Sequence, residues 1–246
     1  MLVAAGFLLA GNGLQATLVA LRAGQEGFPA TLIGLMGTTY YLGYIAATFL
    51  APGLIRGVGH IRVFAALASV AACGTLLLSL VVEPVPWVMI RCVMGFCFCG
   101  LFMVIESWLN DTADNTNRAR ILSIYRLVDF GAVTGIQFLL PVFGTTGFEI
   151  FAVTTLLFCV SLVPVSLSER CNPIPPAAFR FDIGLIWRIS PLACMGCLTI
   201  GLTTSAFRLV GPFYATEIGL DVTGVAIFMS AGLLGGAIFQ YPMGWL

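Results

Sequence analysis

Charged residues inside apolar sequence are the first candidates for chemistry in this 246-residue chain. Glu106 lies near the end of one apolar run, and Arg126 and Asp129 lie near the start of the next. Asp129 follows Arg126 by three residues, so the two share a helix face and can form an ion pair, with Glu106 as the alternative partner. A carboxyl group beside an arginine in apolar surroundings can carry a proton or control a gate. The same residues can instead form a structural ion pair that joins two helices, and both alternatives stay open.

Other polar side chains within apolar runs are candidates to bind a small solute. Arg91 can bind an anionic group or, alternatively, extend toward the outer surface of a membrane. Asn12 and Gln15 are three residues apart, which places both on one helix face, where they can bond a solute or a neighbouring helix. The tyrosines can line a cavity or pack against other helices. The candidate substrate-binding residues are Asn12, Gln15, Tyr40, Tyr41, Arg91 and Gln137.

The residue types that most enzymes need are missing or isolated. All eleven basic residues are arginines, and without a lysine no Schiff base can form. His60 is the single histidine and is expected to be a solvated loop residue, so neither a hydrolase triad nor a histidine metal site is expected. Cys194 and Cys197 lie in an apolar run without a second pair, and no nucleotide-binding glycine loop is present. We therefore expect no enzyme, no catalytic residue, no metal and no cofactor.

Composition indicates a membrane protein. Hydrophobic residues make up 59% of the chain and charged residues 9%, whereas soluble domains are about 25% charged. The net charge is zero, so nucleic acid is not expected as a partner. A bilayer core requires about 20 apolar residues of helix, and eight runs meet this length. The expected spans are Leu2–Leu21, Gly27–Ile55, Val63–Val82, Trp87–Trp108, Phe130–Phe148, Ile150–Ser168, Ile189–Phe207 and Val222–Leu246.

The distribution of arginine predicts the orientation. Seven arginines lie in the connections after the second, fourth and sixth runs, and only Arg22 and Arg208 lie on the other side. Cytoplasmic loops carry the excess of basic residues, so we expect a multi-pass protein of the bacterial inner (plasma) membrane with a cytoplasmic N-terminus. The seven arginines are Arg56, Arg62, Arg118, Arg120, Arg170, Arg180 and Arg188.

A polar stretch divides the chain into two parts. Residues 169–188 contain three prolines and three arginines and are expected to be a cytoplasmic linker. Residues 1–168 then form a six-helix bundle, and residues 189–246 form the first two helices of a second one. Gly27 and Thr31 recur as Gly219 and Thr223 at a constant offset of 192 residues, which indicates an internal repeat of the kind that transporters contain.

The connection after the second run resembles the cytoplasmic loop motif of the major facilitator superfamily. Its glycine and basic positions correspond to Gly53, Arg56, Gly59 and Arg62, although Arg56 occupies the position where the family has an acidic residue. The stretch from Arg91 to Gly95 is similar to the Arg-x-x-x-Gly motif of the family's fourth helix. The stretches 106–110 and 123–126 resemble the bacterial YcaD-type branch.

This resemblance implies an all-α helical bundle that moves a small solute by alternating access. We expect a secondary active transporter driven by an ion gradient, with protons as the candidate ion, and facilitated diffusion stays open as the alternative. Its partners would be the solute, the lipid bilayer and protons. It also implies twelve helices, so we expect the natural reading frame to continue past Leu246 for about four more. The alternatives are a channel and an inert, truncated membrane protein.

The arginine distribution generates a test of the orientation. A reporter fused after Arg62 or Arg120 is expected to be cytoplasmic, and one fused near Glu83 or Gly147 is expected to be periplasmic. Labelling of an Arg120→Cys variant by a membrane-impermeant thiol reagent added outside the cell would contradict this orientation.

Overall fold

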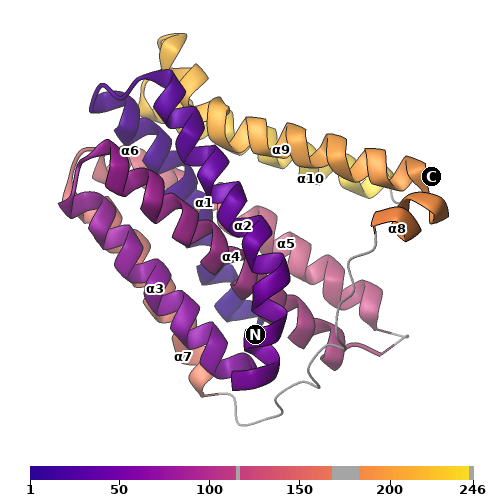
Figure 1. The fold of residues 1–246 in the computed structure, drawn as a ribbon. Helices are drawn as coiled ribbons and strands as arrows, with labels where there is room; N and C mark the ends of the chain where they lie inside the picture. The colour runs from indigo at the N-terminus through magenta and orange to yellow at the C-terminus, as the bar shows by residue number, and fades with distance from the viewer. Residues whose placement is uncertain (115–116, 168–182, 244–246) are drawn as a thin grey trace.

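The structure is a computed structural model that describes residues 1–114, 117–167 and 183–243, and this part of the chain is a bundle of helices without strands (Figure 1). The expected all-α membrane fold is confirmed. The helices are α1 (Leu2–Gln25), α2 (Ala30–Val58), α3 (His60–Leu80), α4 (Pro84–Thr112), α5 (Arg118–Ile136), the 3₁₀ helix η1 (Gln137–Leu139), α6 (Leu140–Phe143), α7 (Phe148–Ser166), α8 (Ile183–Ile189), α9 (Pro191–Glu217) and α10 (Val222–Met243).

Most of these helices are long and apolar enough to cross a bilayer. Six qualify in the described residues, and α9 makes a seventh when its two bent segments count as one span. In α10 the apolar part is the shorter segment Val222–Gly236. The expected fifth span begins earlier than Phe130, because α5, η1 and α6 form one span that includes the charged turns. Its break at η1 precedes Pro141, which lacks the N–H that would bond to the carbonyl of Gln137.

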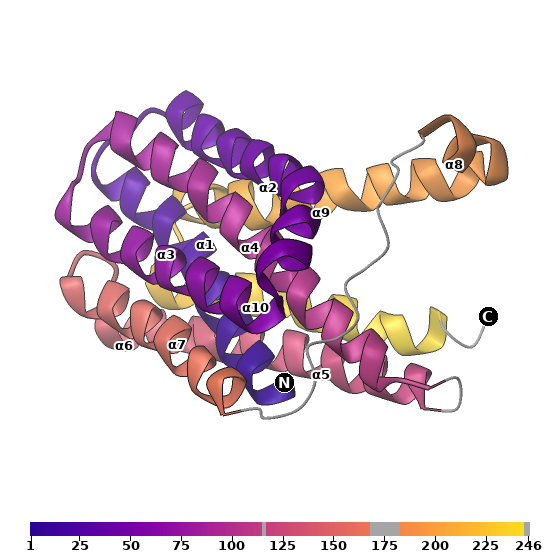
Figure 2. The same ribbon diagram turned by 60° about the horizontal axis from the view of Figure 1, so that its bottom comes forward.

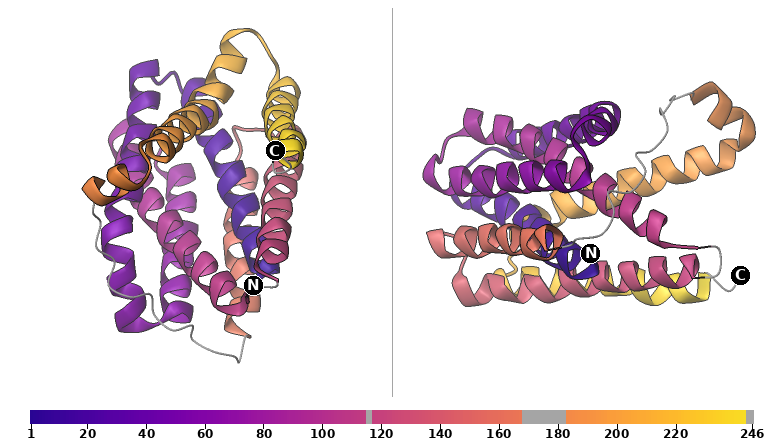
Figure 3. Two further views of the ribbon diagram at one scale, coloured as in Figure 1. Left: turned by 90° about the vertical axis from the view of Figure 1, so that its right-hand side faces the viewer. Right: turned by 90° about the horizontal axis from the view of Figure 1, so that it is seen from below.

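Helix α1 is the centre of the six-helix bundle. It packs against α5 and α7, while α3 packs against α4 and α7, and α2 packs against α4 (Figure 2). Helices α9 and α10 lie against this bundle through α1 and α5 respectively. Helix α10 runs alongside α5, whereas α9 diverges from α2 and α4 toward α8 (Figures 1 and 3).

The backbones of α2 and α4 come into direct contact where they cross. A Cβ atom on Gly43 would collide with the backbone carbonyl of Cys92, and one on Gly95 would collide with the carbonyl of Tyr40. Only glycine therefore permits this approach, as in other close crossings of membrane helices. The crossing holds Tyr40 of α2 beside Arg91, which lies one turn before Gly95 on α4.

The connections α1–α2 and α9–α10 have the same geometry. Gly27 and Gly219 have φ angles of +74° and +85°, which favour glycine because it lacks a Cβ atom. In the first turn the N–H of Phe28 donates to the carbonyl of Ala23, and in the second the N–H of Leu220 donates to that of Ala215. These pairs keep the offset of 192 residues, as an internal repeat requires.

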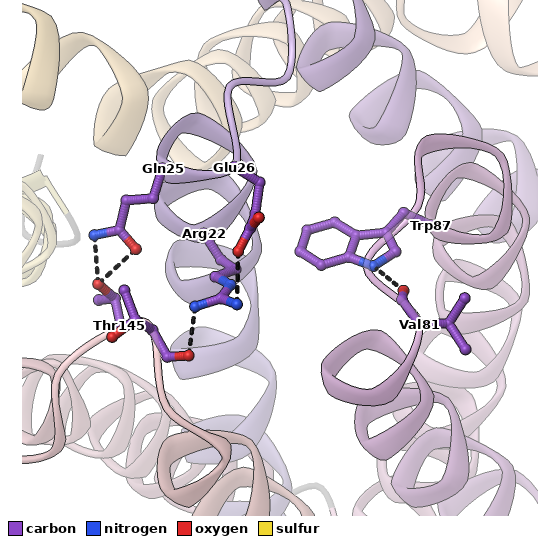
Figure 4. Close-up of polar contacts among 7 residues, drawn as sticks. Arg22, Gln25, Glu26, Val81, Trp87 and Thr145 are labelled. Carbon is purple, nitrogen blue, oxygen red and sulfur yellow. Dashed lines mark hydrogen bonds and ion pairs between the residues drawn. The ribbon is translucent and has the colours of Figure 1, made fainter.

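Polar contacts tie the end of α1 to the connection between α6 and α7 (Figure 4). Arg22 pairs with Glu26 at 2.6 Å and also donates to the carbonyl of Thr146. The amide of Gln25 and the hydroxyl of Thr145 exchange hydrogen bonds of 2.6 and 3.0 Å. The indole of Trp87, across the same end of the bundle, donates to the carbonyl of Val81 at 2.7 Å. This end of the bundle is therefore braced by hydrogen bonds.

The predicted cytoplasmic loop motif is not a loop. Helix α2 continues to Val58 and α3 begins at His60, so Gly59, with a φ angle of +93°, is the whole connection. Arg56 and Arg62 lie in the adjoining helix turns and are exposed, as is Gly53 within α2. The expectation of a solvated His60 is wrong: its side chain is buried, and Nε2 lies 3.0 Å from Oγ of Ser107.

The expected linker falls partly outside the described residues. Residues 169–182 of the linker belong to the part that is not described, and its remaining residues, 183–188, lie in α8.

The glycine crossing generates a stability prediction. A Gly43→Ala substitution forces α2 and α4 apart, and we expect it to cost about 3 kcal/mol of folding stability. Gly34→Ala in the same helix is the matched control, because a Cβ atom there would meet no atom within 4 Å. Thermal melting of the purified protein by circular dichroism compares the two. Equal melting temperatures for both variants would show that the crossing does not limit stability.

Candidate functional site

A cavity of about 180 Å³ lies between α1, α2 and α4 of the six-helix bundle and α9. It brings together four of the six candidate substrate-binding residues, Asn12, Tyr40, Tyr41 and Arg91. Its wall also contains residues that sequence reasoning did not select. The lining residues are Asn12, Ala16, Gly37, Tyr40, Tyr41, Tyr44, Arg91, Phe102, Thr204 and Arg208.

Arg91 is buried beside the cavity and stacks on an aromatic ring. Its side chain is 5% exposed, and Cζ lies 4.4 Å from the centre of the Tyr40 ring. The alternative that Arg91 extends to the membrane surface is therefore wrong in this structure. A cation–π contact of this kind contributes about 2 kcal/mol when it is desolvated. Nε of Arg91 nevertheless has no hydrogen-bond partner among the described residues.

Helix α2 supplies the aromatic wall of the cavity. The rings of Tyr40 and Tyr41 meet edge to face at 5.4 Å between centroids, and those of Tyr40 and Tyr44 lie 6.5 Å apart. The hydroxyl of Tyr40 donates to Oδ1 of Asn12 over 3.4 Å, a long hydrogen bond that joins α2 to α1. Arg91, Tyr40 and Asn12 thus form a connected polar path across three helices.

The two glutamines do not line this cavity. Gln15 is fully buried, and its Nε2 donates 2.7 Å to the hydroxyl of Thr75 on α3, the helix contact that was its alternative role. Nε2 of Gln137 donates 3.3 Å to the carbonyl of Gly13. Gln137 also lines a crevice of about 10 Å³, together with Arg208, which is space for about one water molecule.

Arg208 is the residue that the sequence analysis missed. The seventh span was expected to end at Phe207 with Arg208 at its edge, whereas α9 continues to Glu217 and Arg208 lines the cavity. The two segments of α9 meet there at a bend of 44°. Pro212 lacks the N–H that would bond to the carbonyl of Arg208, four residues earlier, and its ring disfavours a straight helix at that point. An arginine four residues before a proline in apolar sequence was the available signal.

The candidate coupling residues Glu106, Arg126 and Asp129 are not among the described residues that line the cavity. Nη1 of Arg126 is 3.5 Å from Oδ2 of Asp129, so of the two partners left open by the sequence, Asp129 forms the ion pair. The side chain of Arg126 is 56% exposed and that of Asp129 is 14% exposed. The charge of Arg208 also acts on the Asp129 carboxylate. Glu106 is exposed on the last turns of α4.

Metal binding has no support in the described part of the chain, where no group of three or more His, Cys, Asp or Glu residues lies close enough to hold an ion.

Known proteins share this architecture. The family profile described as Major Facilitator Superfamily matches residues 1–246. An uncharacterized MFS-type transporter of Enterobacter sp. (strain 638) is 24% identical over 236 residues, which cover 94% of this chain and 61% of the relative. The uncharacterized MFS-type transporter YcaD of Escherichia fergusonii is 25% identical over 253 residues, which cover 100% of this chain and 65% of the relative.

A solved structure has the same fold. The crystal structure of the nucleoside transporter NupG is similar with a TM-score of 0.75 at 12% identity, over 99% of this chain and 66% of that chain. The chain thus spans less than two thirds of the length of the two curated relatives above. It is a multi-pass membrane protein, and it belongs to the Major Facilitator Superfamily.

Proposed function

We propose that the protein is a secondary transporter that moves a small solute across the bacterial inner membrane by alternating access. The observation that carries this proposal is the cavity, because its wall combines α1, α2 and α4 with α9, which begins the second repeat unit. Solute sites of secondary transporters lie at such repeat interfaces. The transporter relatives and the fold shared with NupG support the same function.

The packing of α9 suggests how access alternates. Near the α9–α10 connection, Ala215 is buried in an apolar cluster with Leu18 and Leu21 of α1. Toward α8, the helix diverges from α2 and α4 (Figure 3). With the N-terminus in the cytoplasm, this arrangement corresponds to a transporter that is open inward. Access from the other side then requires α9 to separate from α1, and the bend beside Arg208 is where we propose that it hinges.

The carboxyl group that we propose for proton coupling is Asp129. It is the largely buried acid of the cluster formed by Glu106, Arg126 and Asp129, it pairs with Arg126, and the charge of Arg208 also acts on it. One of these, Arg208, also lines the cavity. Protonation of Asp129 would weaken its electrostatic attraction to both arginines. Binding of a proton would thereby affect Arg208, which lies in the cavity wall that contacts the solute.

Reconstituted transport tests the main proposal. The full-length protein in proteoliposomes is expected to take up a solute with saturable kinetics, and uptake is expected to rise under an imposed proton gradient. Uptake that increases linearly with solute concentration would identify a channel instead. Absence of uptake for every solute in a broad panel, with protein shown to be folded and inserted, would contradict transport.

Double substitutions test the charge cluster. Arg126→Leu strands the Asp129 carboxylate, so it is expected to lower the yield of folded protein. Arg126→Leu/Asp129→Asn is expected to recover folding, whereas the control Arg126→Leu/Glu106→Gln is not. The interaction energy between Arg126 and Asp129 is expected to be about 0.5–1 kcal/mol because Arg126 is half exposed. A double variant that folds but shows no proton-driven uptake would indicate that the cluster couples protons to transport. Wild-type yield and uptake in every single variant would show that the cluster has neither role.

A further inference from the structure

The described lining of the central cavity contains positively charged side chains and no acidic one. Arg91 and Arg208 are the charged residues of its wall, and none of the described residues that line it is an aspartate or a glutamate. The remaining polar groups are the hydroxyls of the tyrosines and Thr204 and the amide of Asn12. Charge of one sign in a cleft with low-dielectric walls concentrates ligands of the opposite sign.

Arg91 has the features of a ligand-binding residue rather than of a residue that only holds two helices together. Its side chain is only 5% exposed and lines the cavity. Its Nε has no partner in the part of the chain that the structure describes. Its contact with Tyr40 places Cζ over the ring face, and this contact gives Nε no hydrogen-bond acceptor. An unpaired buried N–H is unfavourable, and a ligand oxygen would satisfy it.

The second arginine of the cavity lies on a different helix. Arg91 is on α4 of the six-helix bundle and Arg208 is on α9, at the bend. Arg208 has Asp129 as an electrostatic neighbour, but that carboxylate pairs with Arg126 at 3.5 Å. Two guanidinium groups that line one cavity repel each other, and an anion bound to both converts this repulsion into two charge-assisted contacts.

We propose that the solute is a small organic anion, a carboxylate or a phosphate ester, whose oxygens bind between Arg91 and Arg208. This inference rests on the proposed transport function. A cavity of about 180 Å³ limits the ligand to roughly ten non-hydrogen atoms, since a cavity of about 150 Å³ holds benzene. The rings of Tyr40, Tyr41 and Tyr44 provide an aromatic wall for the rest of the molecule. Because its oxygens bind both arginines, the anion would draw α9 toward α4.

Equilibrium binding tests the proposal independently of transport. The purified protein, in nanodiscs of phosphatidylcholine so that no anionic lipid competes, is titrated with radiolabelled benzoate in a scintillation proximity assay. Unlabelled benzamide, lactate and inorganic phosphate serve as competitors. Benzoate is expected to bind saturably, lactate and phosphate to compete, and benzamide, its neutral isostere, not to compete.

Substitutions assign the site. Arg91→Gln and Arg208→Gln are each expected to weaken benzoate binding about 10-fold to 100-fold, the loss of a hydrogen bond to a charged group. Arg91→Lys keeps the charge without the fork of donors and is expected to bind with intermediate affinity. Arg120→Gln, an exposed arginine that does not line the cavity, is the control and is expected to bind like the wild type. Only variants that elute as a monodisperse peak and melt cooperatively are compared.

Several outcomes would overturn the proposal. They are equal competition by benzamide and benzoate, unchanged binding in both folded glutamine variants, or no binding of benzoate, lactate or phosphate by the folded wild type at millimolar concentration. Uptake of a neutral solute without binding of any anion would contradict this inference and support the proposed function. Binding of benzoate through both arginines without transport of any solute would support the inference and contradict the proposed function.

Discussion

The crossing of α2 and α4 at Gly43 and Gly95 is the contact on which the geometry of the cavity depends. With the two backbones in direct contact, the turn of α4 before Gly95 faces the turn of α2 that carries Tyr40. The guanidinium of Arg91 then lies on the Tyr40 ring, and the Tyr40 hydroxyl reaches Asn12 on α1. A bulkier residue at the crossing would separate these groups, because the spacing between helices follows from the side chains at their contact. The short Arg-x-x-x-Gly sequence therefore encodes both a charge and the approach that positions it.

The repeated turn gives the second wall of the cavity. Gly27 and Gly219 close α1 and α9 with the same left-handed conformation and the same pattern of hydrogen bonds. Asp221 adds a cap to α10, where Oδ1 accepts from the N–H of Gly224 at 2.8 Å. Each turn joins two antiparallel helices, and the second pair, α9 and α10, contacts the first bundle through α1 and α5. A cavity bounded by two such units can change its opening when one unit tilts, without either unit unfolding.

The sequence predicted the helices well and the site only in part, for physical reasons. Long apolar runs identify spans because every backbone polar group in a bilayer must be satisfied within a helix. Counting charge-free residues fails where a helix contains charged residues, and for this reason the predicted fifth span began too late and the predicted seventh span ended before Arg208. Which face a polar residue presents depends on tertiary packing, so Gln15 and Asn12, three residues apart, contact different helices. The burial of His60 followed from a one-residue connection that composition does not reveal.

The free-energy cost of burying Arg91 with no hydrogen-bond partner for Nε among the described residues bears on the function of the cavity. If Arg91 served only to hold α4 against α2, the contact at Gly43 and Gly95 would do so without burying a charge. The Tyr40 ring offsets part of the desolvation cost but accepts no hydrogen bond from Nε. On another helix of the same cavity, Arg208 lies at the bend of α9, where the helix is least constrained by its own hydrogen bonds. Under the proposed alternating access, one charge is on a wall that stays fixed and the other on a wall that moves. Their mutual repulsion would then change as the cavity opens and closes, and the shape of the cavity would be sensitive to the charge of what it holds.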